Sequence, residues 1–302
     1  MENMERLKKK YIIYAPKYSK SNGVRVLYKL RQLLEKRGYE AYIFAPFSDE
    51  ALNTKYIKNI TSEMKKNDIV IYPEVTTGNP LEFQNVVRYI LYYPGKNGGE
   101  SVYDEYEKEF TFFDFYKKDT EILYINNIDR NLFFYDGTQK DIDSYFVYKG
   151  GKWKDLSELK DAVEINSEYP QKRLDLANLL RRTKTLYSYD RHTILLDEAL
   201  LCGCTVKIIT EDGFEDYKIS DSSLNEPEEI GLDNFIKITQ MMNYTGKIRK
   251  ENKLRQFKAV LKLIKYSTKY IIYNFLLINK QKASIYREKI DSAIFKIRYK
   301  GW

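Results

Sequence analysis

The chain has 302 residues, of which 43% are hydrophobic and 31% charged, so it has room for two globular domains of roughly 100–150 residues each. Its two cysteines are too few for a disulfide framework or a four-ligand zinc site, and its one histidine excludes a multi-histidine metal mechanism. The net charge of +8 is uneven, since residues 247–302 carry 16 Lys and Arg against 3 acidic residues. Residues 1–246 are net acidic, which argues against a uniformly basic nucleic-acid-binding protein.

The N-terminal segment, Met1–Lys10, is charged and leads directly into a short apolar run. It lacks the apolar region of a signal peptide, and no stretch of the sequence approaches the ~20 apolar residues that span a bilayer. We therefore expect a cytoplasmic protein that does not cross a membrane.

The first half alternates between strand and helix patterns. β-Branched and aromatic runs predict strands, and apolar residues three and four apart predict helices. In chain order we expect strand Tyr11–Ala15, helix Val24–Lys36, strand Glu40–Ala45, helical stretch Ile57–Lys66, strand Ile69–Tyr72, helix Leu81–Tyr92 and strand Ile122–Ile125. This βαβ alternation predicts a parallel sheet with helices on its faces.

A second series of the same kind follows. The expected elements are strand Tyr145–Tyr148, helix Leu156–Ala162, helix Leu174–Arg182, strand Thr185–Tyr187, helix Thr193–Leu201 and strand Val206–Ile209. We predict an α/β protein with two Rossmann-like domains, 1–140 and 141–246, facing across a cleft, and a basic helical tail, 247–302. The polar stretch Gly137–Asp143 is the candidate linker.

The turn before the helix Thr193–Leu201 is a candidate phosphate site. Asp190 or Thr193 can cap that helix, whose first N–H groups carry partial positive charge and suit a diphosphate. Glu198 lies a little over two helical turns beyond Asp190. Two carboxylates at this spacing can bind donor hydroxyls at separate points, although a solvated Glu198 and a plain N-cap Asp190 would give the same pattern.

The segment Asp190-x7-Glu198, followed by Ala199-x3-Gly203, resembles the Glu-x7-Glu and Ala-x3-Gly elements in the donor domain of GT-B glycosyltransferases, with Asp in place of the first Glu. The resemblance implies that Glu198 binds the ribose of a nucleotide-sugar and Asp190 the transferred sugar. It also implies a transferase that needs neither metal nor cofactor, with family 4 of these enzymes the nearest donor-domain pattern. Tyr189, His192 and Thr193 are further donor-binding candidates, His192 being equally typical of an exposed surface residue.

Basic residues upstream can compensate the charge of a leaving diphosphate. Lys149 and Lys152 flank a Gly-Gly turn after the strand Tyr145–Tyr148, and Arg173 precedes a helix. A lysine-flanked surface turn and a packing role for Arg173 are the alternatives. Asp141-x-Asp143 resembles a metal-binding DxD but falls in the linker, so we predict no metal site.

Two loops of the first half follow strands, at the edge where open α/β sheets bind ligands. The first holds Asn22 and Gly23, and a simple strand-to-helix loop would explain it equally well. The second is Pro73–Pro80, with Glu74 as a possible base and Asn79 beside it. The run IYPEVTTGNPLEFQNVVRYILYYPG resembles bacterial polysaccharide glycosyltransferases, which implies that Glu74 and Asn79 lie on the acceptor side of the cleft.

In the tail, apolar residues from Leu254 to Phe275 recur at helical spacing beside a face of lysines. Such a helix can lie on an anionic membrane surface through residues 250–300, or it can pack across the domains. The leading hypothesis is transfer of a sugar from a nucleotide-sugar to a glycan or lipid-linked acceptor of a bacterial surface polysaccharide. The alternatives are a catalytically silent scaffold of the same fold and a nucleic-acid-binding protein, although no nucleic-acid partner is expected.

Overall fold

The computed structural model describes residues 8–19, 21–45, 55–147, 156–166, 168–246, 264–269, 287, 289 and 290. The chain forms two compact units. Unit 1 comprises Met1–Ser19, Val26–Ile125 and Glu229–Trp302, and unit 2 comprises Lys20–Arg25 and Asn126–Glu228. The chain therefore passes from unit 1 to unit 2 after Ile125, whereas we expected the boundary after residue 140. The boundary lies earlier because Leu132 and Phe133 already pack in the core of unit 2.

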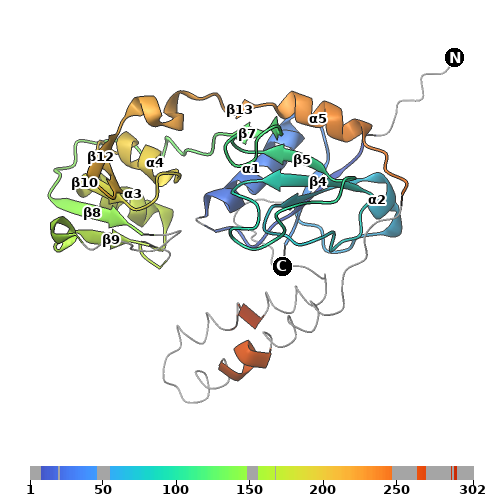
Figure 1. Ribbon diagram of the computed structural model, residues 1–302, viewed down its shortest axis with the longest axis horizontal. Coiled ribbons are helices and arrows are strands. Elements are labelled where there is room, and N and C mark those ends of the chain that lie inside the picture. The colour runs from blue at the N-terminus through green and yellow to red at the C-terminus, as the bar shows by residue number, and fades with distance from the viewer. Residues whose placement is uncertain are drawn as a thin grey trace. The chain divides into compact units, whose positions relative to one another are not determined.

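Unit 1 is built on a parallel sheet with the strand order β2-β1-β3-β4-β5-β6 (Figure 1). Its strands are β1 (Tyr11–Tyr14), β2 (Ala41–Phe44), β3 (Ile69–Pro73), β4 (Asn85–Ile90), β5 (Lys108–Thr111) and β6 (Glu121–Ile122). The helices are α1 (Asn22–Lys36), α2 (Ser62–Asn67) and α5 (Leu232–Met241). The order reverses between β1 and β3, as in doubly wound folds of the flavodoxin type, and such a reversal point is where these sheets bind ligands.

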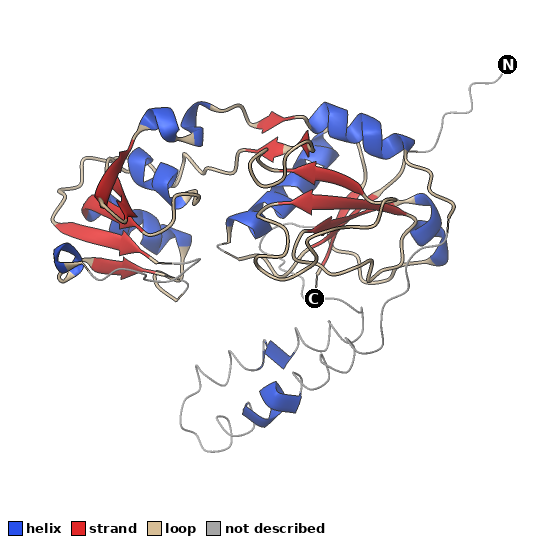
Figure 2. Ribbon diagram, viewed as in Figure 1, coloured by secondary structure: helices blue, strands red, loops and turns tan. Residues whose placement is uncertain are grey.

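The two faces of this sheet are covered differently. On one face Phe235 of α5 stacks on Tyr11 and meets Phe110, with ring centroids 6.0 and 4.7 Å away. On the other, Leu81 and Phe83 from the β3–β4 connection pack on Tyr14 and Tyr72 together with Met64 of α2. Figure 2 shows that this connection is a loop rather than a helix.

The predicted helix Leu81–Tyr92 is wrong. Its centre is strand β4, in which all six residues are buried. A strand that is covered on both faces reads as a continuous apolar run, and in a short run helix and strand patterns coincide. The helix expected over Ile57–Lys66 is also reduced to α2, which begins after its N-cap Thr61.

The chain leaves unit 1 and returns to it at neighbouring positions. Strand β7 (Tyr124–Ile125) pairs antiparallel with β13 (Glu229–Ile230), and the N–H of Asn126 donates to the carbonyl of Glu228. The side-chain amide of Asn126 also donates to the carbonyls of Ser223 and Glu226. The two connecting segments are thus fixed to each other by backbone pairing.

Unit 2 contains a second sheet, ordered β12-β11-β10-β8-β9, in which only β12 is antiparallel to its neighbour. The strands are β8 (Ile142–Phe146), β9 (Val163–Ile165), β10 (Thr183–Ser188), β11 (Thr205–Thr210) and β12 (Gly213–Tyr217). The helices are α3 (Arg173–Arg182) and α4 (Leu195–Leu201), with short 3-10 turns η2 (Ser157–Leu159), η3 (Ile219–Asp221) and η4 (Ser223–Asn225). Two parallel-sheet α/β units are therefore present, as the sequence predicts, and the helix expected at Leu156–Ala162 is only the turn η2.

The Gly of the Ala199-x3-Gly203 element ends α4. The N–H of Cys204 donates to the carbonyl of Ala199 and that of Gly203 to the carbonyl of Leu200, the two bonds of a Schellman cap. Gly203 has φ +76°, a left-handed conformation that favours glycine. This cap lets β11 begin at Thr205, two residues after Gly203.

Lys140 binds the carbonyl ends of both helices of unit 2. Its Nζ lies 3.4 and 3.1 Å from the carbonyl oxygens of Leu180 and Arg181, and 2.9 Å from those of Thr183 and Cys202. An ammonium group at helix C-termini satisfies carbonyls that have no partner within the helix and opposes their partial negative charge. One side chain thus ties α3 to α4.

Among the described residues, no helix is both long and apolar enough to cross a membrane. Residues 264–269, 287, 289 and 290 are helical, and the rest of the predicted basic tail lies outside the described residues. Its binding to an anionic membrane stays a prediction.

We expect Lys140→Met to lower the free energy of unfolding by about 2–4 kcal/mol, since several carbonyls lose a charged donor at once. Urea unfolding followed by circular dichroism measures the loss. The matched control is Lys184→Met, an exposed lysine of β10, for which we expect a change within about 0.5 kcal/mol. Equal losses of unfolding free energy in the two variants would contradict a role for Lys140 in joining α3 to α4.

Candidate functional site

A buried carboxylate and an arginine pair near the carboxyl edge of the unit 2 sheet. Arg173 is the first residue of α3, and its Nη1 and Nη2 donate to Oε2 and Oε1 of Glu198 at 3.0 and 2.8 Å. Glu198 is 1% exposed, whereas the Arg173 side chain is 22% exposed. Such a two-point contact fixes both groups in one plane and orientation.

A second guanidinium group lies against the same carboxylate. Arg25 belongs to unit 2 although most of α1 lies in unit 1. Its Nη1 and Nη2 lie 3.4 and 3.5 Å from Glu198 Oε1, and Nη2 donates to the carbonyl of Asn127 at 2.6 Å. The Arg173 guanidinium also lies over the Phe133 ring, 4.4 Å from its centroid. In this cluster, Arg25, Arg173 and Glu198, two guanidinium groups thus lie against one carboxylate.

Two amides near Arg25 contain buried atoms without a hydrogen-bond partner among the described residues. They are Oδ1 of Asn22, three residues before Arg25, and Nδ2 of Asn127, whose carbonyl Arg25 binds. Buried polar atoms are nearly always bonded, so each such exception needs an explanation. One donor and one acceptor beside a cationic cluster are what a polar anionic ligand would use. Gly23, the other residue expected in this loop, is half-buried in the first turn of α1.

The loop between β10 and α4 is closed by its own polar groups. Asp190 Oδ1 accepts from the N–H of His192 at 2.8 Å, and the Ser188 hydroxyl donates to the carbonyl of Asp190 at 2.7 Å. His192 is exposed, and Tyr189 packs against a small apolar cluster around Tyr145. Asp190 and His192 therefore lie at the carboxyl end of β10, where the sequence predicts donor-binding residues.

The helix after this loop begins later than predicted. It starts at Leu195 with Ile194 as N-cap, and no side chain caps it, whereas we expected a start at Thr193 capped by Asp190 or Thr193. The Thr193 hydroxyl accepts from the N–H of Leu195 at a long 3.4 Å, and α4 has only seven residues. The positive charge near Glu198 therefore comes from arginine side chains, not from this helix terminus.

Other predicted site residues are not placed. Lys149 and Lys152 lie outside the described residues. Within the described part of the chain, no group of three or more His, Cys, Asp or Glu side chains is arranged to hold a metal ion.

In unit 1, Arg88 organises the loop Pro73–Pro80 from inside the core. This side chain, in the middle of β4, is fully buried. Nη1 donates to the carbonyls of Pro73 and Thr76 at 3.4 and 2.7 Å, and Nη2 to that of Gly78 at 2.9 Å. Nε and Nη2 lie 2.9 and 2.7 Å from Glu107 Oε2. All five donors of the guanidinium are thus used within unit 1.

Asn79 is part of the same internal framework. Its Oδ1 accepts from the Tyr72 hydroxyl at 2.9 Å and from the N–H of Phe83 at 3.1 Å. Its Nδ2 donates to the Phe83 carbonyl at 2.7 Å and to the Tyr106 hydroxyl at 3.4 Å. These four bonds use the whole hydrogen-bonding capacity of the amide, which leaves none for the acceptor that we expected Asn79 to bind.

Glu74 is likewise enclosed. It is 4% exposed, and its Oε2 accepts from the N–H of Leu91 at 3.0 Å. A Cβ at Gly99 would lie 2.1 Å from the Glu74 carbonyl oxygen, so only glycine allows the neighbouring loop to pack this closely. A general base must come within hydrogen-bond distance of its substrate, and the geometry around Glu74 is that of a fixed loop.

Sequence reasoning missed Arg25, Arg88 and Glu107 as organising residues. The available signal was an arginine inside the apolar run of β4, since a buried cation requires a carboxylate partner. No local pattern could have paired Arg25 with Glu198, which is 173 residues away in the chain.

No protein-family model matches the chain, and no curated protein matches its sequence. Among the solved structures similar to it is a protein from Listeria monocytogenes that is proposed to be a UDP-N-acetylglucosamine 2-epimerase. The two chains are 11% identical with a TM-score of 0.37, over 67% of this chain and 80% of the other. A likeness at this level is too weak to assign an activity, so the function of this chain has to be inferred from its own residues.

Burial raises the pKa of the Glu107 carboxyl to about 7, with the Arg88 guanidinium opposing the shift. A carboxyl whose pKa is higher in the folded than in the unfolded chain stabilises the fold below the unfolded pKa, and this contribution is lost as the pH rises through the folded pKa. We expect Glu107→Gln to remove this loss. Measured by urea unfolding, the stability of wild type relative to the variant should fall by on the order of 3 kcal/mol between about pH 4 and about pH 8. A difference that stays constant would show that the Glu107 carboxyl has the same pKa in the folded and the unfolded chain.

Proposed function

We propose that the chain is a glycosyltransferase that moves a sugar from a nucleotide-sugar bound by unit 2 to a glycan or lipid-linked acceptor of a bacterial surface polysaccharide. The observation that carries the proposal is the cluster Arg25, Arg173 and Glu198, in which two guanidinium groups lie against one carboxylate and whose neighbours include the unpartnered amide atoms of Asn22 and Asn127. The Asp190-x7-Glu198 spacing, through its resemblance to the GT-B donor motif, supplies the class of ligand.

The proposed roles follow from the chemistry of each group. Guanidinium groups bind phosphate oxygens at two points, so Arg25 and Arg173 are assigned to the diphosphate and stabilise the charge that develops as it leaves. A carboxylate has about four acceptor positions, and Arg173 uses two of them on Glu198. Ribose hydroxyls would take the positions that Arg25 contacts only at 3.4 and 3.5 Å.

Asp190 is assigned to the sugar by the same resemblance. Its carboxylate is half-buried at the carboxyl end of β10, and one oxygen is used by the His192 N–H. The other oxygen is the one that would contact a sugar hydroxyl. Lys149 and Lys152 remain candidates for binding the diphosphate. The proposal also keeps the expectation that the substrates bind in a cleft between the two domains.

Calorimetric titration with UDP, GDP, dTDP and CMP tests the donor site. We expect one of these nucleotides to bind, and Arg173→Lys to weaken that binding about tenfold or more, because lysine keeps the charge but loses the two-point contact. The matched control is Arg191→Lys, an exposed arginine of the same unit paired with Glu215, for which we expect no change. Circular dichroism confirms that each variant is folded.

Release of free nucleotide from the corresponding nucleotide-sugar then tests turnover. Glu198→Gln keeps the shape of the side chain but removes its charge, and we expect turnover to fall at least as much as nucleotide affinity. Binding without turnover in the wild type would favour the silent scaffold. Folded protein that binds none of the four nucleotides would refute the donor site.

A further inference from the structure

The connection between β5 and β6, residues 112–120, begins with a cluster of aromatic rings in unit 1. The cluster consists of Phe112, Phe113, Phe115 and Tyr116 of this connection, Tyr92 and Tyr93 after β4, and Tyr124 of β7. Each ring contacts at least one other, with centroids between 4.6 and 5.7 Å apart. We call this set the aromatic platform.

The platform has a buried layer and a partly exposed layer. Phe112 and Tyr116 are 7% exposed and Tyr124 4%, so these rings form a fixed floor. On this floor Phe113 and Phe115 stack at 4.9 Å with their planes 19° apart, and Phe115 is 41% exposed. Rings that are held in place before binding lose little conformational freedom when a ligand stacks on them.

Its position in the sheet is one where ligands bind. Strands β4 and β5 are parallel neighbours, and Tyr92, Tyr93 and Phe113 lie two or three residues beyond their carboxyl ends. Open parallel sheets bind ligands outside the carboxyl ends of their strands. A ring that served only to pack the core would be buried, whereas Phe115 is exposed.

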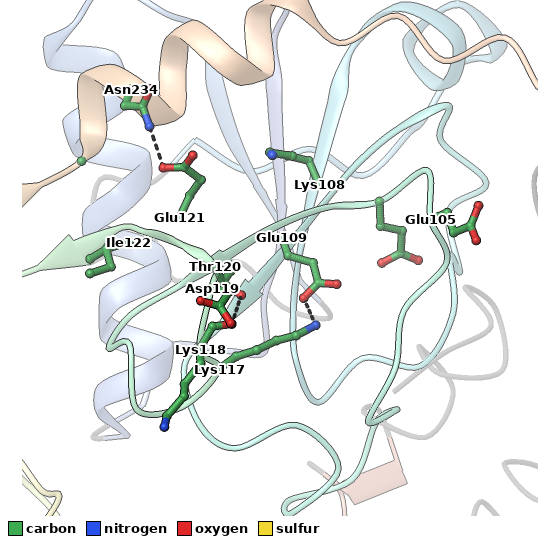
Figure 3. A pocket seen from close by; sticks show the side chains of 12 residues that line it. Glu105, Lys108, Glu109, Lys117, Lys118, Asp119, Thr120, Glu121, Ile122 and Asn234 are labelled. Atoms are coloured by element: carbon green, nitrogen blue, oxygen red, sulfur yellow. Dashed lines mark hydrogen bonds and ion pairs between the residues drawn. The ribbon is translucent and has the colours of Figure 1, made fainter.

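The same connection continues into a hollow of about 910 Å³, which is at the upper end of the usual range for ligand pockets. Figure 3 shows charged side chains of both signs around it, from Lys117, Lys118 and Asp119 of the connection and from Glu105, Lys108 and Glu109. Lys117 pairs with Glu109, and Asn234 donates to Glu121 at 2.9 Å. Among the described residues, Glu105, Lys108, Lys118 and Asp119 make no ion pair, so their donors and acceptors can serve a ligand.

The charges around the platform indicate what kind of ligand fits. Between Phe112 and Tyr124 the chain carries Lys117 and Lys118 against Asp114, Asp119 and Glu121. Nucleic acids and anionic lipid surfaces both need a positive surplus, which this segment lacks. A neutral glycan suits it, because sugar rings present apolar faces to aromatic rings and hydroxyl groups to neighbouring charged side chains.

We propose that the aromatic platform and the adjoining hollow form a binding site for a neutral glycan. As an acceptor site it rests on the proposed function, but glycan binding itself needs no nucleotide. The sugar rings stack on Phe113, Phe115 and Tyr93, and hydroxyl groups hydrogen-bond to Lys118 and Asp119.

Binding of the full-length protein is measured on an array of neutral oligosaccharides without nucleotide. Each oligosaccharide that binds is then titrated by calorimetry. We expect at least one neutral glycan to bind, and Phe115→Ala and Tyr93→Ala each to raise its Kd about three- to tenfold. The control is Phe214→Ala, a partly exposed ring of unit 2 that contacts Tyr187, for which we expect no change. Asp119→Asn should weaken binding without affecting the stacked rings.

The outcomes separate this site from the donor site. Glycan binding that persists in a protein unable to bind nucleotides supports the platform and refutes only the proposed function. Absence of binding across the array, or equal losses in Phe214→Ala, overturns the proposal. Two other results would also overturn the proposal. The first is that the wild type binds single-stranded DNA or anionic phosphatidylserine vesicles and the two ring variants lose that binding. The second is that the wild type is a dimer and the ring variants are monomers.

Discussion

The buried guanidinium of Arg88 is the constraint on which unit 1 depends. A cation with no exposed surface is tolerated only if a carboxylate and other acceptors surround it. Glu107 supplies the carboxylate, and the carbonyls of Pro73, Thr76 and Gly78 supply the other acceptors. Those carbonyls are available only when the chain after β3 curls around β4 as a loop. A helix in this connection would use its own carbonyls, so the buried cation and the missing crossover helix have one explanation.

The Arg88 site and the Arg173 site differ in burial and in the number of guanidinium groups for each carboxyl group. Arg88 is fully buried, each of its five donors has a partner, and one carboxyl group, that of Glu107, is paired with it. Around Glu198 there are two guanidinium groups for one carboxylate, and one of these groups is partly exposed. The loop with the more specific sequence, PEVTTGNP, proves to be the closed one. The proposed ligand site therefore rests on two guanidinium groups at one carboxylate and not on the residue types of a loop.

Much of the fold follows from local patterns. Amphipathic spacing predicts α1 and α3 to within two residues at each end, and β-branched runs predict β1, β3 and β11. The pattern fails at β4, because a strand covered on both faces has no alternation to distinguish it from a helix. It also fails at the division of the chain, since Phe133 precedes the predicted linker yet packs in the core of unit 2. Of the proposed donor residues, Glu198 and Arg173 are suggested by spacing and charge, but Arg25 requires the tertiary structure.

The proposed donor site would be built from arginine side chains rather than from a helix terminus, and this has a physical consequence. The partial charge of a helix N-terminus is fixed by the backbone, and a seven-residue helix that starts at Leu195 presents little of it. A guanidinium carries a full charge and can change partners. Glu198 holds Arg173 by a two-point contact and Arg25 by longer contacts, so Arg25 is the cation that an incoming diphosphate would draw away from Glu198 first. Glu198 would then orient the two guanidinium groups before the ligand binds and accept hydrogen bonds from ribose hydroxyls afterwards. These two roles would account for a carboxylate at the centre of a site proposed to bind an anion.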